Sequence, residues 1–428
     1  MSSPSAPTPV PTQRDGATPG RSGRLRGQPT AVWAVLFACI VAFMGIGLVD
    51  PILPVIAKGV HASASQVELL FTSYFLIIGV SNLLAGYAST RLGAKNTLLC
   101  GLALVVVFSA LAGSSDTVAQ IVGFRAGWGL GIALFVSTSM SVIVATAAGG
   151  VSAAVVLFES ALGVGIASGP LVGGLLGGVS WRAPFFGVAI LLAIGFVAFL
   201  RGLAPTPRPP ARERIGALEP LKALRHRSLL AASVIALLYN FGFFTLLAYT
   251  PLPLGLGVPQ RGIVFFAWGA LLALGAVFGA PLLTRRFSLV PLLATLFVMI
   301  AVDLLVVGFG IHSQQVMIPA IIVSGAFLGV ANASLSTLLM RVSVAGPSIS
   351  ASATNFVRFV GGAIAPYLAG KLSTSLSVGA PLFVAAVAVG AAIALLALAR
   401  SALEIDVHAP AQLDGELAVE YERELAAT

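Results

Sequence analysis

The stretch Gly165–Gly174, which reads GIASGPLVGG, indicates that this part of the chain lies in a membrane. It lies inside an apolar segment that runs from about residue 152 to residue 178. Each glycine inside a soluble helix costs about 1 kcal/mol relative to alanine. In lipid, glycines let two helices approach closely, and neighbouring helices compensate for the backbone bond that Pro170 removes. Gly165, Gly169 and Gly173 form one smooth stripe, so we predict a membrane helix packed tightly on a neighbour.

The composition of the chain is also that of a membrane protein. Of its 428 residues, 58% are hydrophobic and 9% are charged, whereas a soluble domain carries about 25% charged residues. The net charge of +9 comes mostly from basic residues between apolar segments, so we expect a lipid bilayer and no nucleic acid as partner. Cys39 and Cys100 have neither metal-ligand nor redox spacing.

Apolar segments of membrane-spanning length occur twelve times in the sequence. A spanning helix needs about 20 mostly apolar residues. The predicted spans are 32–54, 67–88, 97–114, 118–141, 152–177, 183–201, 229–254, 262–284, 289–311, 315–340, 350–372 and 379–400. We therefore predict an all-α membrane protein with twelve transmembrane helices in two pseudo-symmetric six-helix bundles.

The long polar segments divide the chain into domains. A Pro- and Arg-rich linker at 202–228 separates an N-terminal bundle at 31–201 from a C-terminal bundle at 229–400. We expect 1–30 to be a disordered tail and 401–428 to be an acidic tail. No signal peptide is visible in the polar residues 1–30.

The distribution of basic residues predicts the orientation. With the N-terminus inside, eighteen Lys and Arg residues fall on the inner side, and only Lys58, Arg182, Arg261 and Lys371 fall on the outer side. Cytoplasmic loops carry the excess of positive charge. We therefore expect a multi-pass protein of the cell membrane, with the linker and both termini in the cytoplasm.

The two halves of the chain also repeat each other. VDPILP at 49–54 matches YTPLPL at 249–254, GWGLGIA at 127–133 matches GAFLGVA at 325–331, and GIASGPLVGG matches GGAIAPYLAG at 361–370. The offsets are 200, 198 and 196 residues, in the same order along the chain. Parallel repeats of this kind imply a pseudo-two-fold axis along the membrane normal and a central cavity between the halves.

Three motifs resemble those of the major facilitator superfamily, and the likeness covers about residues 30–400. The pattern of Gly165, Gly169, Pro170, Gly173 and Gly174 resembles the fifth-helix antiporter motif of that superfamily. The resemblance implies a role for these residues in conformational change, and it is greatest to the drug:proton antiporters with twelve spans.

The other two motifs lie in the first half of the chain. GYASTRLGAKNTLL, from residue 86, resembles the cytoplasmic loop motif through Gly86, Arg91 and Gly93, with Thr90 at the position of the usual aspartate. RAGWGLGIA, from Arg125, resembles the fourth-helix motif, with Trp128 at the position of its glutamine. The resemblance implies that the arginine of this motif is linked to proton coupling.

Ionisable residues inside predicted spans are functional candidates, because each is costly in lipid unless it is paired or hydrated. Asp50 either exchanges protons or caps the end of its helix, and Arg125 is either its partner in proton coupling or part of a permanent ion pair. Glu159 is an alternative proton site, or a contact for a cationic substrate. Asp303 is expected to contact another helix, and Arg358 either receives an anionic substrate group or neutralises an acid.

Aromatic and amide side chains predict the substrate surface. Tyr239, Asn240 and Phe244 lie near the middle of one span, and Asn240 and Phe244 are four residues apart, on one helix face. Rings combined with one amide suit an amphipathic guest. We add to this site the residues Trp128, Asn332 and Arg358. Packing among helices or contact with lipid is the alternative for the aromatic residues.

The predicted function is secondary active transport, with proton-coupled export of small hydrophobic or amphipathic compounds by alternating access. Proton-coupled import of a metabolite is one alternative, and a membrane sensor that no longer transports is another. The four histidines lie in loops or tails, and no Walker A sequence or catalytic cluster occurs. We therefore expect no metal, no cofactor and no enzymatic activity, and a monomer whose partners are a small-molecule substrate and protons.

Overall fold

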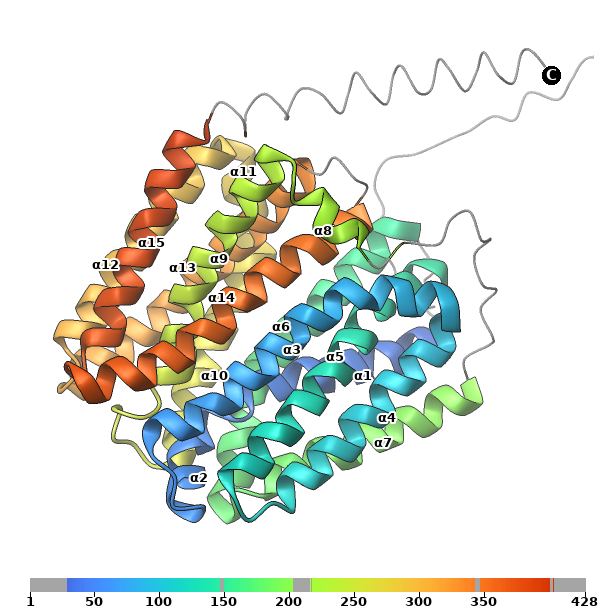
Figure 1. Cartoon of the computed structure of the whole chain (residues 1–428), viewed down its shortest axis with the longest axis horizontal. Helices are drawn as coiled ribbons and strands as arrows, with labels where there is room; N and C mark the ends of the chain where they lie inside the picture. The colour runs from blue at the N-terminus through green and yellow to red at the C-terminus, as the bar shows by residue number, and fades with distance from the viewer. Residues whose placement is uncertain are drawn as a thin grey trace, which may run out of the picture.

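The computed structural model describes residues 29–146, 150–202, 216, 218–342, 347–400 and 403. The tails predicted at 1–30 and 401–428 lie almost entirely outside these ranges, as does much of the linker predicted at 202–228. Within the described part, long helices follow one another with short connections and are arranged in two groups (Figure 1).

We call the first group the N-half and the second group the C-half. The N-half consists of α1 (Thr30–Gly47), η1 (Asp50–Ile52), α2 (Leu53–Gly59), α3 (Ala64–Leu92), α4 (Ala94–Gly113), α5 (Val118–Thr146), α6 (Gly150–Val179) and α7 (Ala183–Gly202). After the short connecting helix α8 (Glu219–Ala223), the C-half consists of α9 (Arg227–Tyr249), α10 (Val258–Leu274), η3 (Gly275–Gly279), α11 (Ala280–Arg286), α12 (Leu289–Phe309), α13 (Gln314–Arg341), α14 (Pro347–Ser375) and α15 (Ala380–Leu398).

Eleven helical segments within the described ranges are long and apolar enough to cross a membrane. The helix α14 has 29 residues and is the twelfth long helix, but it is not among those eleven. Its polar side chains include Ser350 and Thr354, which are both buried and face protein rather than lipid. The helix lies against α3 of the N-half and α9 of the C-half. The predicted all-helical, twelve-span fold is therefore confirmed, and its most polar span lies between the halves.

The first span is broken rather than continuous, unlike the single helix predicted at 32–54. The helix α1 ends at Gly47, and the chain passes through η1 before α2 begins. Pro51 and Pro54 cause the break, because proline cannot donate the backbone hydrogen bond that a continuous helix requires. Asp50 consequently lies at a helix interruption.

The predicted glycine stripe packs on α1. A Cβ atom added to Gly165 would lie 2.6 Å from the carbonyl oxygen of Ile40, and one added to Gly169 would lie 2.5 Å from that of Met44. A Cβ atom at Gly173 would collide with the carbonyl oxygen of Leu48. The two backbones are therefore too close for any side chain, which is the role that small residues have at helix contacts in membranes.

The halves meet along two seams, α3 against α14 and α6 against α10. A Cβ atom on Gly174 would lie 2.8 Å from Cα of Gly262 in α10, and one on Gly370 of α14 would lie 2.7 Å from Cα of Ser65 in α3. Gly174 and Gly370 are equivalent in the predicted repeat, and each contacts the opposite half. The internal repeat thus places the same close contact at both seams.

These two contacts lie toward one end of the bundle. Figure 1 shows α2 at that end and α8 at the opposite end, and we name the ends accordingly the α2 end and the α8 end. The helix α3 begins at the α2 end with Ala64, and α14 finishes there with Ser375. The halves are therefore in close backbone contact at the α2 end.

We expect Gly169→Ala to destabilise the protein, because the added methyl group has no space against α1. Overpacking of a tight contact costs about 1–3 kcal/mol. The measurement is thermal unfolding of the detergent-solubilised protein, followed by size-exclusion chromatography after heating.

Gly390→Ala in α15 is the matched control, because a Cβ atom there would meet nothing within 4 Å. We expect its unfolding temperature to equal or exceed that of the wild type, since alanine favours helix. Equal stability of the two variants would contradict the proposed tight contact.

Candidate functional site

Asp50 is completely buried at the interruption between α1 and α2. Neither of its carboxylate oxygens has a hydrogen-bond partner among the described residues. A Cβ atom added to Gly47 would lie 3.4 Å from Oδ2 of Asp50 and 3.0 Å from Cδ of Pro170, so the carboxyl group lies beside α6. The carboxylate thus makes no capping bond within the described part of the chain, and its predicted proton exchange stays a prediction.

Arg125 is buried in α5 between two aromatic rings. Its guanidinium carbon lies 4.0 Å from the ring centroid of Tyr74 and 4.7 Å from that of Trp128. One terminal nitrogen donates to the carbonyl oxygen of Gly45 at 3.4 Å, while Nε and the other terminal nitrogen have no partner in the described structure. Cation–π contacts of this kind stabilise a desolvated charge by about 2 kcal/mol.

Asp50 and Arg125 interact electrostatically. They form no ion pair in the described part of the chain, where the ion pairs are Arg182–Asp116 and Lys222–Glu219. The two groups are therefore neighbours that are not in contact, which differs from the alternative of a permanent ion pair. We call Asp50, Tyr74, Arg125 and Trp128 the N-half cluster.

Trp128 is a core residue of the N-half cluster and has no exposed surface. Its ring makes edge contacts with Tyr74 at 6.1 Å and with Phe185 at 6.2 Å between centroids. A Cβ atom on Gly45 would lie 2.7 Å from the indole ring, so the ring lies directly on the α1 backbone. In this arrangement Trp128 positions Arg125, and its predicted contact with substrate stays a prediction.

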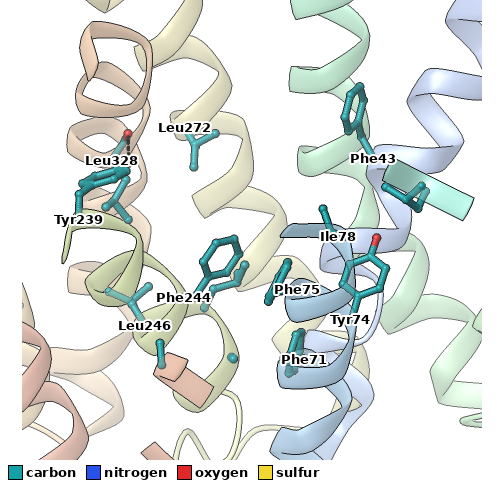
Figure 2. Packing of buried hydrophobic residues seen from close by; sticks show 14 of the residues in the cluster. Phe43, Phe71, Tyr74, Phe75, Ile78, Tyr239, Phe244, Leu246, Leu272 and Leu328 are labelled. Atoms are coloured by element: carbon teal, nitrogen blue, oxygen red, sulfur yellow. Dashed lines mark hydrogen bonds between the residues drawn. The ribbon is translucent and has the colours of Figure 1, made fainter. Parts of the chain in front are cut away.

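The predicted C-half residues form a second group. The hydroxyl of Tyr239 donates to the carbonyl oxygen of Leu328 at 2.8 Å, as Figure 2 shows, and the ring stacks on Phe297 at 5.7 Å. Arg358 of α14 donates to Oδ1 of Asn332 in α13 at 2.6 Å, and it also interacts electrostatically with Tyr239. We call Tyr239, Asn332 and Arg358 the C-half cluster.

Aromatic rings lie between these two clusters. The Phe75 ring of α3 lies 4.1 Å from that of Phe244 in α9 and stacks on that of Phe359 in α14 at 6.0 Å, centroid to centroid. Figure 2 shows Phe75 and Phe244 facing each other across the two halves. Asn240, one turn before Phe244, is buried in α9. The structure thus brings Phe244 to the seam, whereas Tyr239 faces into the C-half.

Two further acidic residues, Glu159 and Asp303, are candidates for functional roles inside the membrane. Glu159 belongs to α6, but its side chain lies outside the described part of the structure. Asp303 is nearly buried in α12, and its Oδ2 has no partner among the described residues, so the expected contact with another helix is not seen for that atom.

The loop-motif residues lie at the α8 end of α3. Gly93 joins α3 to α4 with a φ of 83°, a conformation that glycine adopts without strain. Arg91 is exposed, and its guanidinium lies 5.1 Å from the ring centroid of Tyr87. The Thr90 hydroxyl donates to the carbonyl oxygen of Tyr87, so it serves its own helix rather than the next one. Gly86 lies one turn before Thr90 in α3.

The sequence analysis missed one buried acid, Glu68. The predicted span begins at residue 67, which suggests a hydrated position near the membrane surface, but the structure buries the side chain completely. Neither carboxylate oxygen has a hydrogen-bond partner in the described ranges. The available signal is the spacing of Glu68, Thr72, Phe75 and Gly79, which lie on one face of α3.

Comparison of the amino-acid sequence with known proteins shows which family the chain belongs to. Residues 35–366 match the family model of the Major Facilitator Superfamily. The chain is 48% identical over 379 residues to the multidrug efflux protein YfmO of Bacillus subtilis, with 89% of this chain and 95% of that protein covered. It is 35% identical over 185 residues to the tetracenomycin C resistance and export protein of Streptomyces glaucescens, which covers 42% of this chain and 33% of that one.

The fold is also found in solved structures. The crystal structure of a bacterial homolog to the human lysosomal transporter Spinster, in an inward-facing and unoccupied conformation, superimposes with a TM-score of 0.75. It covers 89% of this chain and 98% of its own, at 15% identity. Twelve long helices, two seams between repeated halves and the matched family model together lead to one assignment: this protein belongs to the Major Facilitator Superfamily.

Proposed function

We propose that this protein exports small hydrophobic or amphipathic compounds from the cell in exchange for protons, by alternating access. The observation that carries the proposal is the completely buried Asp50, whose carboxylate has no hydrogen-bond partner in the described structure and lies near the equally buried Arg125. The similarity to a multidrug efflux protein across 89% of the chain supports the direction and the substrate class.

The coupling step follows from the separation of the two charges. An ionised carboxylate is attracted to the guanidinium, and a neutral carboxyl group is not. The present arrangement, in which the groups are close but unpaired, corresponds to the neutral form. Loss of the proton draws η1 toward α5, and uptake of a proton releases it. Protonation therefore shifts the equilibrium between two arrangements of α1.

The movement of α1 reaches the C-half through α6. The carboxyl group of Asp50 lies beside Pro170, and the backbone of α6 is in direct contact with both α1 and α10. A Cβ atom on Gly262 of α10 would lie 2.8 Å from the carbonyl oxygen of Pro170. A shift of α1 is therefore transmitted to the α6–α10 seam, since the backbones of α6 and α10 meet directly at Gly174 and Gly262.

The orientation completes the proposal. The excess of basic residues on one side supports a cytoplasmic linker and cytoplasmic termini, and in this orientation the α8 end faces the cytoplasm and the α2 end faces outward. The close backbone contacts at the α2 end then close the protein to the outside. We expect a monomer in the cell membrane, because one chain supplies both halves of the pathway.

We expect proton-driven uptake of a fluorescent hydrophobic cation into inside-out vesicles, acidified inside, to fall to background in Asp50→Asn. The amide keeps the shape of the side chain but cannot exchange a proton. Asp303→Asn is the control, because Asp303 is a nearly buried acid of α12 outside both clusters, and we expect it to transport like the wild type. Full uptake in Asp50→Asn would refute coupling at Asp50, and Glu159→Gln would then be tested. Uptake only in right-side-out vesicles would favour import.

We expect Arg358→Gln to increase transport of cationic relative to anionic compounds by roughly tenfold, because unit charges several ångströms apart interact by about 1–4 kcal/mol at the dielectric of a protein surface. The measurement is competition between a cationic and an anionic dye in the same vesicles. Arg182→Gln, which changes an arginine paired with Asp116 within the N-half, is the matched control and should leave the ratio unchanged. An unchanged ratio in Arg358→Gln would exclude Arg358 from the substrate path.

A further inference from the structure

Glu68 is a buried acid that the coupling mechanism above does not use. It lies in the second turn of α3, at the α2 end, and has no exposed surface. Both carboxylate oxygens are without a hydrogen-bond partner in the described ranges. A buried carboxyl group without a hydrogen-bond partner requires an explanation, because its burial raises the free energy of the folded state and packing contacts alone do not offset this cost.

The face of α3 that carries Glu68 is the face that meets the C-half. One turn further along, the hydroxyl of Thr72 donates to the carbonyl oxygen of Ala363 in α14 at 2.9 Å. The next residue on this face, Phe75, meets Phe244 and Phe359. After it, a Cβ atom on Gly79 would lie 3.3 Å from the carbonyl oxygen of Phe356. Glu68 therefore lies in register with three residues that contact the other half.

Among the residues that the structure describes, none forms an ion pair with Glu68. Tyr249 of α9 interacts electrostatically with it, and the Tyr249 hydroxyl donates to the carbonyl oxygen of Val378. Lys58 of α2 and Lys371 of α14, at the same end, are exposed, and neither pairs with Glu68. Arg125 of α5 stacks on Tyr74, which is on a different face of α3. Closing the seam thus surrounds the carboxyl group with protein that cannot neutralise it.

We propose that Glu68 is a proton-binding site of the α3–α14 seam. Its carboxyl group is protonated while the halves are closed at the α2 end, and it releases that proton to the medium on the same side when the halves separate there. A partnerless ionised carboxylate is far better stabilised in water than inside the closed seam, so closure takes up a proton and opening releases one.

This proton differs from the coupling proton in its path. It enters and leaves at the α2 end, so it is not carried across the membrane and adds nothing to the transport stoichiometry. A low pH at the α2 end favours the closed seam, and a high pH there favours the open seam. The inference uses the alternating access of the proposed function, but it does not depend on which compound is moved or on coupling through Asp50.

The test measures the distance between the halves at the α2 end by pulsed electron paramagnetic resonance. Spin labels are attached at Lys58→Cys and Lys371→Cys, two exposed positions in opposite halves, after Cys100→Ser removes the exposed native thiol. We expect the ratio of short to long distances to fall with rising pH by up to about tenfold per pH unit, the limit for one linked proton. Glu68→Gln should keep the short distance at every pH, and Glu68→Asp should restore the pH dependence.

Two controls separate protonation from packing. Asp116→Asn changes an exposed acid at the same end that pairs with Arg182 inside the N-half, and it should titrate like the wild type. Thr72→Val removes the hydrogen bond across the seam, and it should lower the closed fraction at all pH values without changing the slope. A slope in Glu68→Gln equal to that of the wild type would overturn the proposal.

A second measurement needs no variant. Dicyclohexylcarbodiimide modifies protonated carboxyl groups in apolar sites, and peptide mass spectrometry reports each site separately. We expect modification of Glu68 to decline with rising pH in parallel with the loss of the short distance, while the pH profile of Asp50 is independent of it. Constant modification of Glu68 while the seam opens would contradict the proposal.

The two proposals can fail separately. Loss of dye transport in Asp50→Asn, together with an unchanged pH response of Glu68, would support both. If only the transport result failed, coupling through Asp50 would be wrong, and if only the pH response failed, the role of Glu68 would be wrong.

Discussion

Direct backbone contact of α6 with a helix on each side is the constraint on which the rest of this structure depends. The glycine stripe brings α6 onto α1, and Gly174 brings it onto Gly262 of α10. At these glycines the backbones touch directly, so the helices cannot slide independently there, and dense contacts of this kind transmit displacement rather than absorb it. One of the helices that link the two halves is therefore also in contact with the region of Asp50.

The internal repeat extends the same constraint to the second seam. In α14, Gly361 lies on the backbone of α9 and Gly370 lies on Ser65 of α3, which mirrors the contacts of α6. The two seams are nonetheless chemically different. The α6–α10 seam has a direct backbone contact at Gly174 and Gly262, whereas the α3–α14 seam contains a buried acid, a hydrogen bond and stacked rings. A symmetric scaffold thus carries an asymmetric distribution of polar groups, and this asymmetry allows the two seams to respond differently to protons.

The interior arginines and the buried acids of this protein differ in the partners they have. Arg125 is held by two aromatic rings and one carbonyl oxygen, and Arg358 is held by Asn332. The acids are treated differently, since Asp50 and Glu68 lack hydrogen-bond partners in the described ranges. These two arginines thus have partners, whereas the two buried acids have no hydrogen-bond partner in the described ranges. This difference favours the protonated form of the acids, because a neutral carboxyl group needs fewer hydrogen-bond partners than an ionised one.

The sequence alone determined the all-helical membrane fold, the internal repeat and the family, because hydrophobic length, a repeat of about 200 residues and small-residue spacing can be read from the chain without coordinates. It also identified Asp50, Arg125 and the glycine stripe, since a charge or a run of glycines in an apolar span stands out without coordinates. Only the tertiary structure decided which face each residue presents. The structure places Trp128 against Arg125, directs the Tyr239 hydroxyl into the C-half, and buries Glu68, which the sequence analysis did not single out. Burial at a seam depends on a helix about 300 residues away in the chain, and no local pattern reports how closely that helix approaches.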